Sequence, residues 1–366
     1  MLKRLHLRNF TVFADAEFEF GEGLNVLVGT NGTGKTHVLK AGYVVLYNFL
    51  KRNQLFAKNS SNWGKPYEGP ISRPYEVILD NKFKDVFRPS PLYTKELIRH
   101  NTELNEALVQ ETILSADAEV TSAIVLSNDL AVELPIQLPI NSKASLDFIP
   151  PVFIPAKETL TLGWLPSLYG RFDIPFDETY PDLLRLLFGP PLRQPEPAHI
   201  VEKLAQLIGG KVEEEGGHFY LTAENKPRLE MNLVAEGMRK FATLYKLLAN
   251  GTLTPETTLF WDEPEANLNP ALLKELAIIL TDLAQAGFQV ILATHSLFLM
   301  KELHILSRQR KQPVRYFGLY AGEKGDVQVE RQDDFMQLQH IAALDAELAQ
   351  TFDFDEVLEQ DYAGDS

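Results

Sequence analysis

The stretch GTNGTGKT, Gly29 to Thr36, decides the fold class of this chain. It has the spacing Gly-x4-Gly-Lys-[Ser/Thr], in which glycines let backbone N–H groups turn toward a phosphate. The apolar run Leu24–Val28 predicts a buried strand before it. Thr36–Leu46 predicts a following helix, whose N-terminus adds positive dipole. The context therefore predicts a phosphate-binding loop; the alternative is a glycine-rich turn with a coincidental lysine.

The chemistry of such a loop assigns roles to its side chains. We expect Lys35 to reach the β- and γ-phosphates of a nucleotide and the Thr36 hydroxyl to bind Mg²⁺. The predicted nucleotide-binding residues are Gly29, Thr30, Asn31, Gly32, Thr33, Gly34, Lys35, Thr36 and His37.

Two later strands end in polar residues suited to hydrolysis. TTLFWDEPEANLNP (Thr257–Pro270) ends an apolar strand in Asp262 and Glu263, and QVILATHS (Gln289–Ser296) ends another in His295. One carboxylate at a strand end can hold Mg²⁺, and the next can orient or deprotonate the attacking water. We expect Asp262 to bind the metal, Glu263 to be the catalytic base and His295 to sense the γ-phosphate. The alternatives are an ordinary acidic turn and a structural histidine.

A phosphate loop near the N-terminus, a distant Asp-Glu-Pro and a strand ending in histidine resemble the ABC-type ATPase superfamily. LKRLHLRNFTVFADAEFEFGEGLNVLVGTNGTGKT is similar to its SMC, RecF and OLD-like "AAA family ATPase" branch, and DEPEANLNP is closer to the OLD-like form than to the transporter form. The resemblance covers Met1–Asn48 and Met231–Leu303, with FIPAKETL (Phe153–Leu160) between them. It implies an ATPase that uses ATP and Mg²⁺, with Lys35 and His295 assisting the Glu263 base.

That superfamily completes each ATP site with a signature helix from a second subunit. NLVAEGMRKFATLYKLLANG (Asn232–Gly251) predicts an amphipathic helix that matches the signature Leu-Ser-Gly-Gly-Gln in part. Gly237 fits the second glycine, whereas Ala235 stands where serine donates to the γ-phosphate. The resemblance implies a homodimer in which Ala235, Glu236 and Gly237 face the ATP of the opposite copy. The alternative is a helix of the core alone.

The expected fold class is α/β: a P-loop NTPase, specifically an ABC-type ATPase head with an antiparallel N-terminal β lobe and a mixed helical insert. We expect one domain over 1–366, with core halves 1–50 and 228–332, an insert 51–227 and an acidic tail 333–366.

Several expectations concern the stretch between the core halves. Lys51–Pro74 predicts a loop, Leu92–Leu114 a helix and Glu119–Leu138 antiparallel strands. An aromatic segment with Trp164, Tyr169 and Phe172 either docks a partner or packs within the insert. No segment sustains heptads, which argues against a long coiled coil.

Composition limits the function classes. The 366 residues include no cysteine, carry a formal net charge of −15 and contain no apolar run of membrane-spanning length. These features predict a cytoplasmic protein without a membrane partner, and they disfavour indiscriminate binding to nucleic acid.

Three functions remain open. The first is an ATP-hydrolysing, dimerising switch that controls a separate effector, such as a nuclease in a bacterial anti-phage system. The second is a RecF-like repair ATPase that binds duplex DNA. The third is a transporter motor domain, which the long insert and the partial signature disfavour.

Overall fold

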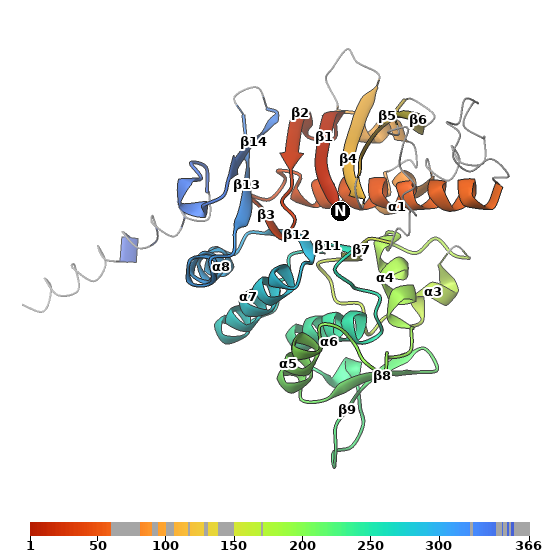
Figure 1. Ribbon diagram of the computed structural model, residues 1–366, viewed down its shortest axis with the longest axis vertical. Helices are drawn as coiled ribbons and strands as arrows, with labels where there is room; N and C mark the ends of the chain where they lie inside the picture. The colour runs from red at the N-terminus through yellow and green to blue at the C-terminus, as the bar shows by residue number, and fades with distance from the viewer. Residues whose placement is uncertain are drawn as a thin grey trace, which may run out of the picture.

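A six-stranded, mainly parallel sheet forms the centre of the computed structural model (Figure 1). Its strand order is β14-β13-β3-β12-β11-β7, and only β14 is antiparallel to its neighbour. The strands are β3 (Leu24–Gly29), β7 (Val152–Ile154), β11 (Thr258–Asp262), β12 (Gln289–Thr294), β13 (Val314–Ala321) and β14 (Val327–Gln332). The structure describes residues 1–59, 81–89, 94–99, 106–115, 118–127, 131–137, 150–169, 171–322 and 325–341, with 346, 350, 353 and 354.

A five-stranded antiparallel sheet, ordered β2-β1-β4-β5-β6, makes the second layer. Its strands are β1 (Leu2–Phe10), β2 (Phe13–Glu19), β4 (Ala107–Ser115), β5 (Ala118–Leu126) and β6 (Ala131–Gln137). The expected antiparallel lobe is therefore present. The stretch 51–227 completes this lobe with three strands and adds β7 to the edge of the central sheet.

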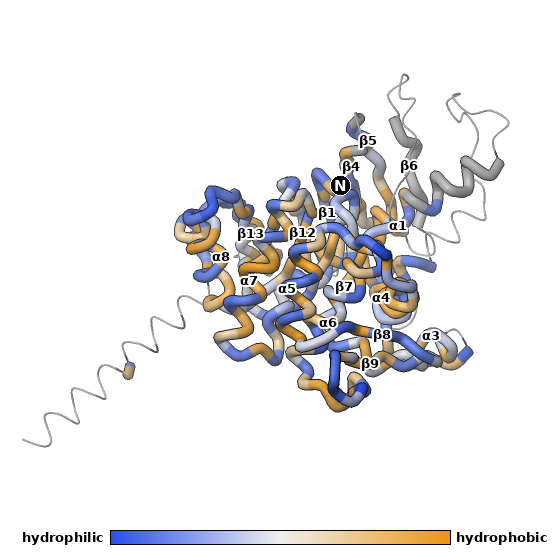
Figure 2. Tube along the Cα trace, turned by 60° about the horizontal axis from the view of Figure 1, so that its bottom comes forward, coloured by the Kyte–Doolittle hydropathy of each residue, from blue (hydrophilic) through white to orange (hydrophobic). Residues whose placement is uncertain are grey.

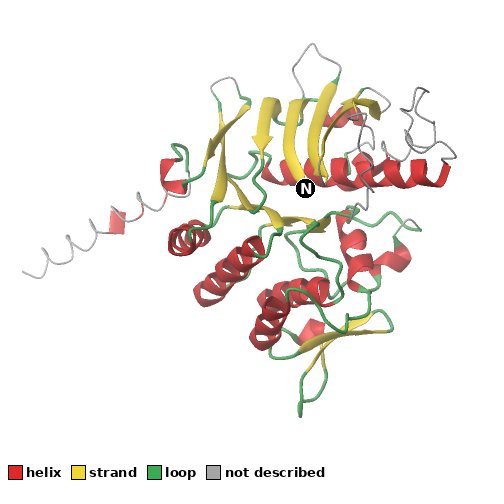
Figure 3. Ribbon diagram, viewed as in Figure 1, coloured by secondary structure: helices red, strands yellow, loops and turns green. Residues whose placement is uncertain are grey.

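Helices cover both faces of the central sheet (Figure 3). Helix α1 lies between the two sheets, and α6, α7 and α8 lie on the opposite face. The helices are α1 (Lys35–Asn59), α3 (Leu165–Leu168), α4 (Thr179–Leu187), α5 (Ala198–Ile208), α6 (Glu236–Ala249), α7 (Pro270–Gln285) and α8 (Leu297–Arg310), with a further helix over 81–87. Short elements are β8 (Lys211–Glu215), β9 (His218–Thr222), β10 (Leu229–Glu230), η1 (Thr94–Leu97), η2 (Met231–Leu233) and η3 (Phe335–Gln337).

Two hydrophobic cores lie on the two faces of the central sheet. Successive side chains of a strand point to opposite faces, so Leu259 and Trp261 enter one core while Phe260 enters the other. The amphipathic helices α5 and α7 alternate hydrophobic and hydrophilic residues in Figure 2 and close one of these cores. Within the described part of the chain, no helix combines the length and apolar character that crossing a membrane requires.

Two local predictions are wrong. In the described parts of Leu92–Leu114 the expected helix is replaced by η1 and the strand β4, which pairs with β1 and β5, while residues 92–93 and 100–105 lie outside the described residues. Alternate residues of β4 are buried, including Val109 and Ile113, so the stretch follows a period of two. Residues 51–59, expected as the start of a loop, continue α1 instead. The rest of that predicted loop lies outside the described residues, as does most of the acidic tail.

Candidate functional site

The loop between β3 and α1 has the backbone shape of a phosphate cradle. Gly32 and Gly34 have φ values of +83° and +85°, which side chains rarely tolerate. A Cβ on Gly34 would also lie 2.6 Å from Val12 Cγ2, so the turn after β1 packs directly against the loop. Thr33 braces it by donating from Oγ1 to the Thr30 carbonyl at 2.9 Å. The glycines are therefore required by backbone conformation and by close packing.

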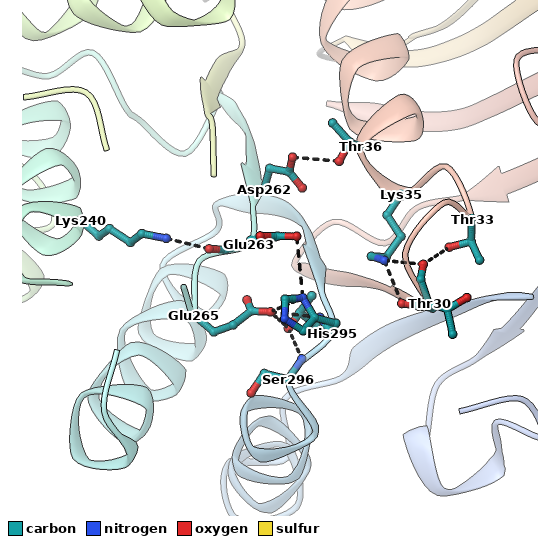
Figure 4. A network of polar contacts seen from close by, with 12 residues as sticks. Thr30, Thr33, Lys35, Thr36, Lys240, Asp262, Glu263, Glu265, His295 and Ser296 are labelled. Carbon is teal, nitrogen blue, oxygen red and sulfur yellow. Dashed lines mark hydrogen bonds and ion pairs between the residues drawn. The ribbon is translucent and has the colours of Figure 1, made fainter. Parts of the chain in front are cut away.

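The Lys35 ammonium lies inside this loop. Its Nζ donates to the carbonyls of Gly29 and Thr30 at 2.8 and 2.9 Å (Figure 4). Burial lowers the pKa of Lys35, while nearby Glu263 and Asp262 oppose that shift. Two neutral carbonyl oxygens thus hold the ammonium group at the loop. Charged phosphate oxygens are stronger hydrogen-bond acceptors and can take the place of these carbonyls.

Asp262 and Thr36 meet as the sequence predicts, although 226 positions separate them. The Thr36 hydroxyl donates to Asp262 Oδ2 at 2.9 Å. They meet because parallel strands β3 and β11 both end at the same edge of the sheet. Burial raises the pKa of Asp262 to about 6, and neighbouring Glu263 adds to this effect. A buried carboxylate beside a hydroxyl offers oxygen ligands that suit Mg²⁺. Nucleotide phosphates supply further oxygen ligands to the same ion.

Glu263 follows Asp262 in an unusual backbone conformation. Its φ is +45°, in the left-handed region that non-glycine residues enter at a cost. Its N–H donates to the Ala293 carbonyl at 3.0 Å, and its own carbonyl accepts from Lys240 Nζ at 2.7 Å. The main chain is fixed on both sides, while the side chain remains about one-third exposed. This conformation places the Glu263 carboxylate at the edge of the sheet, where it is partly open to solvent.

His295 lies beside two carboxylates at the end of β12. Its Nδ1 is 3.8 Å from Glu263 Oε1 and 3.4 Å from Glu265 Oε1 (Figure 4). Glu265 also accepts from Thr294 Oγ1 at 2.7 Å and from the His295 N–H at 3.0 Å. Sequence reasoning missed Glu265, although its place two residues after Glu263 was an available signal. Glu265 fixes the strand end that carries the histidine.

The predicted signature residues form the start of α6. Ala235 is the N-cap residue and supplies no side-chain hydrogen bond, so the first-turn N–H groups lack a side-chain cap. Ala235 and Glu236 are exposed. Gly237 is buried against the loop after Glu263, where an added Cβ would lie 2.7 Å from the Asn267 carbonyl oxygen. Packing alone therefore requires this glycine.

His37 is the one member of the predicted nucleotide set whose side chain is engaged elsewhere. Its ring packs against Phe87, with 5.8 Å between centroids. Burial lowers the pKa of His37 to about 4, so the imidazole is neutral near pH 7. Its backbone N–H, in the first turn of α1, is the group left for a phosphate.

Comparison with known proteins agrees with this geometry. Residues 24–301 match the model of a family described as "AAA domain, putative AbiEii toxin, Type IV TA system". The chain belongs to this family. The chain resembles ABC-type ATPases of the SMC and RecF group, as the sequence indicates, and the α/β fold expected from the phosphate loop is confirmed.

Two curated relatives match parts of this chain. A RecF DNA replication and repair protein from Pediococcus pentosaceus is 52% identical over 126 residues, covering 31% of this chain and 32% of the relative. A Rad50 double-strand break repair ATPase from Archaeoglobus fulgidus is 37% identical over 67 residues, which cover 17% of this chain and 8% of the relative. The matches therefore span about a third or less of these relatives.

Solved structures of SMC heads share the fold. An SMC head bound to the C-terminal winged-helix domain of ScpA has a TM-score of 0.52, with 13% identity over 90% of this chain and 97% of that one. An SMC head with an extended coiled coil, bound to the C-terminal domain of ScpA derived from Pyrococcus furiosus, scores 0.53 at 12% identity, covering 90% and 96%.

Proposed function

We propose that this protein hydrolyses ATP to ADP and phosphate, and that it acts as a dimerising switch. The observation that carries the proposal is the 2.9 Å contact between the Thr36 hydroxyl and Asp262, with Glu263 next along the strand edge. It unites the loop that would bind phosphates, the pair that would bind Mg²⁺ and the acid that would activate water.

The residues of the site divide the chemistry among them. Lys35 and the loop N–H groups bind the β- and γ-phosphates, and Thr36 with Asp262 holds Mg²⁺. When bound, the metal neutralises charge on the phosphate oxygens. Glu263 orients the attacking water and accepts its proton, and His295 donates to the γ-phosphate.

A second copy of the chain completes each site in this proposal. The first turn of α6 begins at the exposed Ala235 and Glu236 and has no side-chain cap, and N–H groups at a helix N-terminus favour anions because of the helix dipole. In a two-fold dimer the contact is reciprocal, so one surface serves both sites. Ala235 offers no hydroxyl, and this contact then depends on the backbone near Gly237.

A separate protein effector is the partner that the surface supports best. Trp164 and Phe172, around α3, are 47% and 65% exposed, so these rings are not part of the insert's core. Exposed aromatic residues are enriched at protein interfaces. The family description names a toxin–antitoxin system. We propose an effector such as a nuclease, in an anti-phage system of the OLD-like type.

Duplex DNA is the second candidate partner, because the RecF and Rad50 relatives are named for DNA repair. The cations along β1 argue against a DNA-binding face there. Lys3 pairs with Glu119, Arg4 with Glu17, and Arg8 lies near Asp15. These pairs neutralise the sheet surface that would meet phosphates.

The ATPase proposal is tested with Lys35→Ala. We expect the wild type to release phosphate from ATP in the presence of Mg²⁺. The variant should bind a fluorescent ATP analogue at least about tenfold more weakly, since it loses a charge-assisted contact to phosphate. Lys301→Ala, on α8, is the control and should bind normally. Unchanged binding by Lys35→Ala would contradict the assigned nucleotide site.

The two partners are separated by filter binding and by pull-down. We expect weak duplex binding with a shallow dependence on salt, whereas a DNA clamp with many phosphate contacts gives a steep slope. Pull-down from the native host should recover a protein that Trp164→Ser with Phe172→Ser loses. Tight, salt-sensitive DNA binding without such a protein would favour the repair function.

A further inference from the structure

A buried lysine connects α6 to the main chain of Glu263. The Lys240 side chain is 4% exposed, and its Nζ donates to the Glu263 carbonyl at 2.7 Å (Figure 4). The pKa of Lys240 is lowered by burial, while Glu265, Glu236 and Glu263 oppose that shift. Burying an ammonium is costly unless it is hydrogen-bonded. The hydrogen bond to the Glu263 carbonyl therefore offsets part of the cost of burying the Lys240 ammonium.

The carbonyl that Lys240 holds belongs to a strained loop. Glu263 and Asn267 both have positive φ, at +45° and +64°. On the β12 side, the Ala293 carbonyl and the Thr294 hydroxyl bind this loop through the Glu263 N–H and the Glu265 carboxylate. On the α6 side, Lys240 makes a polar contact with the loop through its Nζ. The direction of the Glu263 side chain thus depends on α6 as well as on β12.

The same helix begins with the exposed turn assigned to the second copy. Gly237 packs on the Asn267 carbonyl, and Lys240 lies one turn further along α6. A helix transmits a displacement of its first turn along its axis because its backbone bonds are continuous. Any force on Glu236 and Gly237 therefore reaches both ends of the loop, at Glu263 and at Asn267.

We propose that Lys240 is a positioning residue that couples the exposed first turn of α6 to the Glu263 backbone, so that contact with a second copy orients the Glu263 carboxylate for hydrolysis. The inference rests on the proposed ATPase function and deepens it. Hydrolysis in each subunit then responds to dimer contact through that subunit's own α6, in addition to the groups that the partner offers to the nucleotide.

Lys240→Met is compared with a matched variant, Lys246→Met. Lys246 lies on the same helix and is 3% exposed, with a pKa also lowered by burial, but its charged neighbours are Glu214 and Glu213. We expect kcat of Lys240→Met to fall about 10- to 100-fold, the rate equivalent of one charge-assisted hydrogen bond. The affinity for a fluorescent ATP analogue should change little. Lys246→Met should keep the wild-type kcat.

Two further readouts separate coupling from general damage. The specific activity of the wild type should rise with protein concentration as dimers form, and Lys240→Met should lose most of this rise. Lys240→Arg, which keeps a cationic donor, should restore part of it. Hydrogen exchange at the Glu265–Leu268 amides should accelerate in Lys240→Met and not in Lys246→Met. This last measurement needs no hydrolysis.

The outcomes distinguish the two proposals. An inactive wild type with faster loop exchange only in Lys240→Met would reject the ATPase and retain the bond's positioning role. Equal kcat losses in both variants, or unchanged loop exchange in Lys240→Met, would overturn the inference while leaving the ATPase proposal intact. Wild-type kcat and concentration dependence in Lys240→Met would overturn it as well.

Discussion

Glu263→Gln should bind ATP as the wild type does and hydrolyse it about 10²–10⁴-fold more slowly, the usual contribution of a general base. The substitution keeps the shape of the side chain and removes the group that accepts a proton. The backbone should be unaffected, because Glu263 is held through its N–H and its carbonyl, to Ala293 and Lys240. Phosphate release at saturating ATP measures the effect.

The same variant should accumulate the ATP-bound dimer, since closure no longer ends in hydrolysis. Light scattering with and without ATP and Mg²⁺ should show a doubling of mass. Glu265→Gln is the neighbouring control: its oxygens accept from Thr294 and from the His295 N–H, so we expect a smaller loss of rate. Equal turnover in Glu263→Gln and the wild type would exclude Glu263 as the base.

Asp262→Asn should have opposite effects on stability and on function. Without nucleotide and Mg²⁺ at pH 8, the free energy of unfolding of the variant should be up to about 3 kcal/mol higher than that of the wild type. This value corresponds to a pKa rise of about two units at about 1.4 kcal/mol each. The cause is burial, which disfavours the charged carboxylate, and an Asn oxygen can still accept from Thr36. With ATP and Mg²⁺, the variant should lose most of the ligand-induced stabilisation.

The pH dependence follows from the direction of the pKa shift. The folded-state pKa of Asp262, about 6, lies above its unfolded value, 3.8, so the folded protein binds the proton more tightly. This stabilisation is complete below about pH 4 and is lost as the pH rises through about 6. The advantage of Asp262→Asn should therefore shrink between pH 8 and pH 5, as measured by urea unfolding.

A control with the opposite sign is available on α7. Asp282 pairs with Arg310 and lies 3.4 Å from Lys203, so Asp282→Asn breaks attractive contacts and should destabilise the protein. If Asp262→Asn were instead less stable than the wild type at pH 8 without ligand, burial of the charged Asp262 carboxylate would not destabilise the folded protein, and the prediction would be wrong.

The parts of the site that depend on local pattern could be predicted from the amino-acid sequence. The loop Gly29–Thr36 needs glycines at fixed positions between a strand and a helix, and this requirement is legible without any tertiary contact. The buried strands β3, β11 and β12 were predicted because continuous apolar runs end abruptly in polar residues. The approach of Thr36 to Asp262 followed, since parallel strands share one edge.

Sequence pattern gave the wrong element where pairing with other strands determines the structure. Ala107–Ser115 contains residues that suit a helix, and it is a strand because β1 and β5 pair with both of its edges. The end of α1 was also misplaced: no Gly or Pro interrupts residues 47–59, so nothing in the chain stops the helix at Leu46.

The contacts that hold the loop after Asp262 depend on packing between distant segments. Lys240 and Glu265 lie within the two motifs, yet motif matching assigned them no role, because their roles depend on neighbours in other elements. Gly237 matched a signature glycine, yet its close approach to Asn267 became visible only when α6 and the loop were placed together. The phosphate-binding loop can be predicted from residue spacing because residues adjacent in the sequence form it. The burial that shifts the pKa of Asp262 and the bond that fixes Glu263 arise from packing between distant segments.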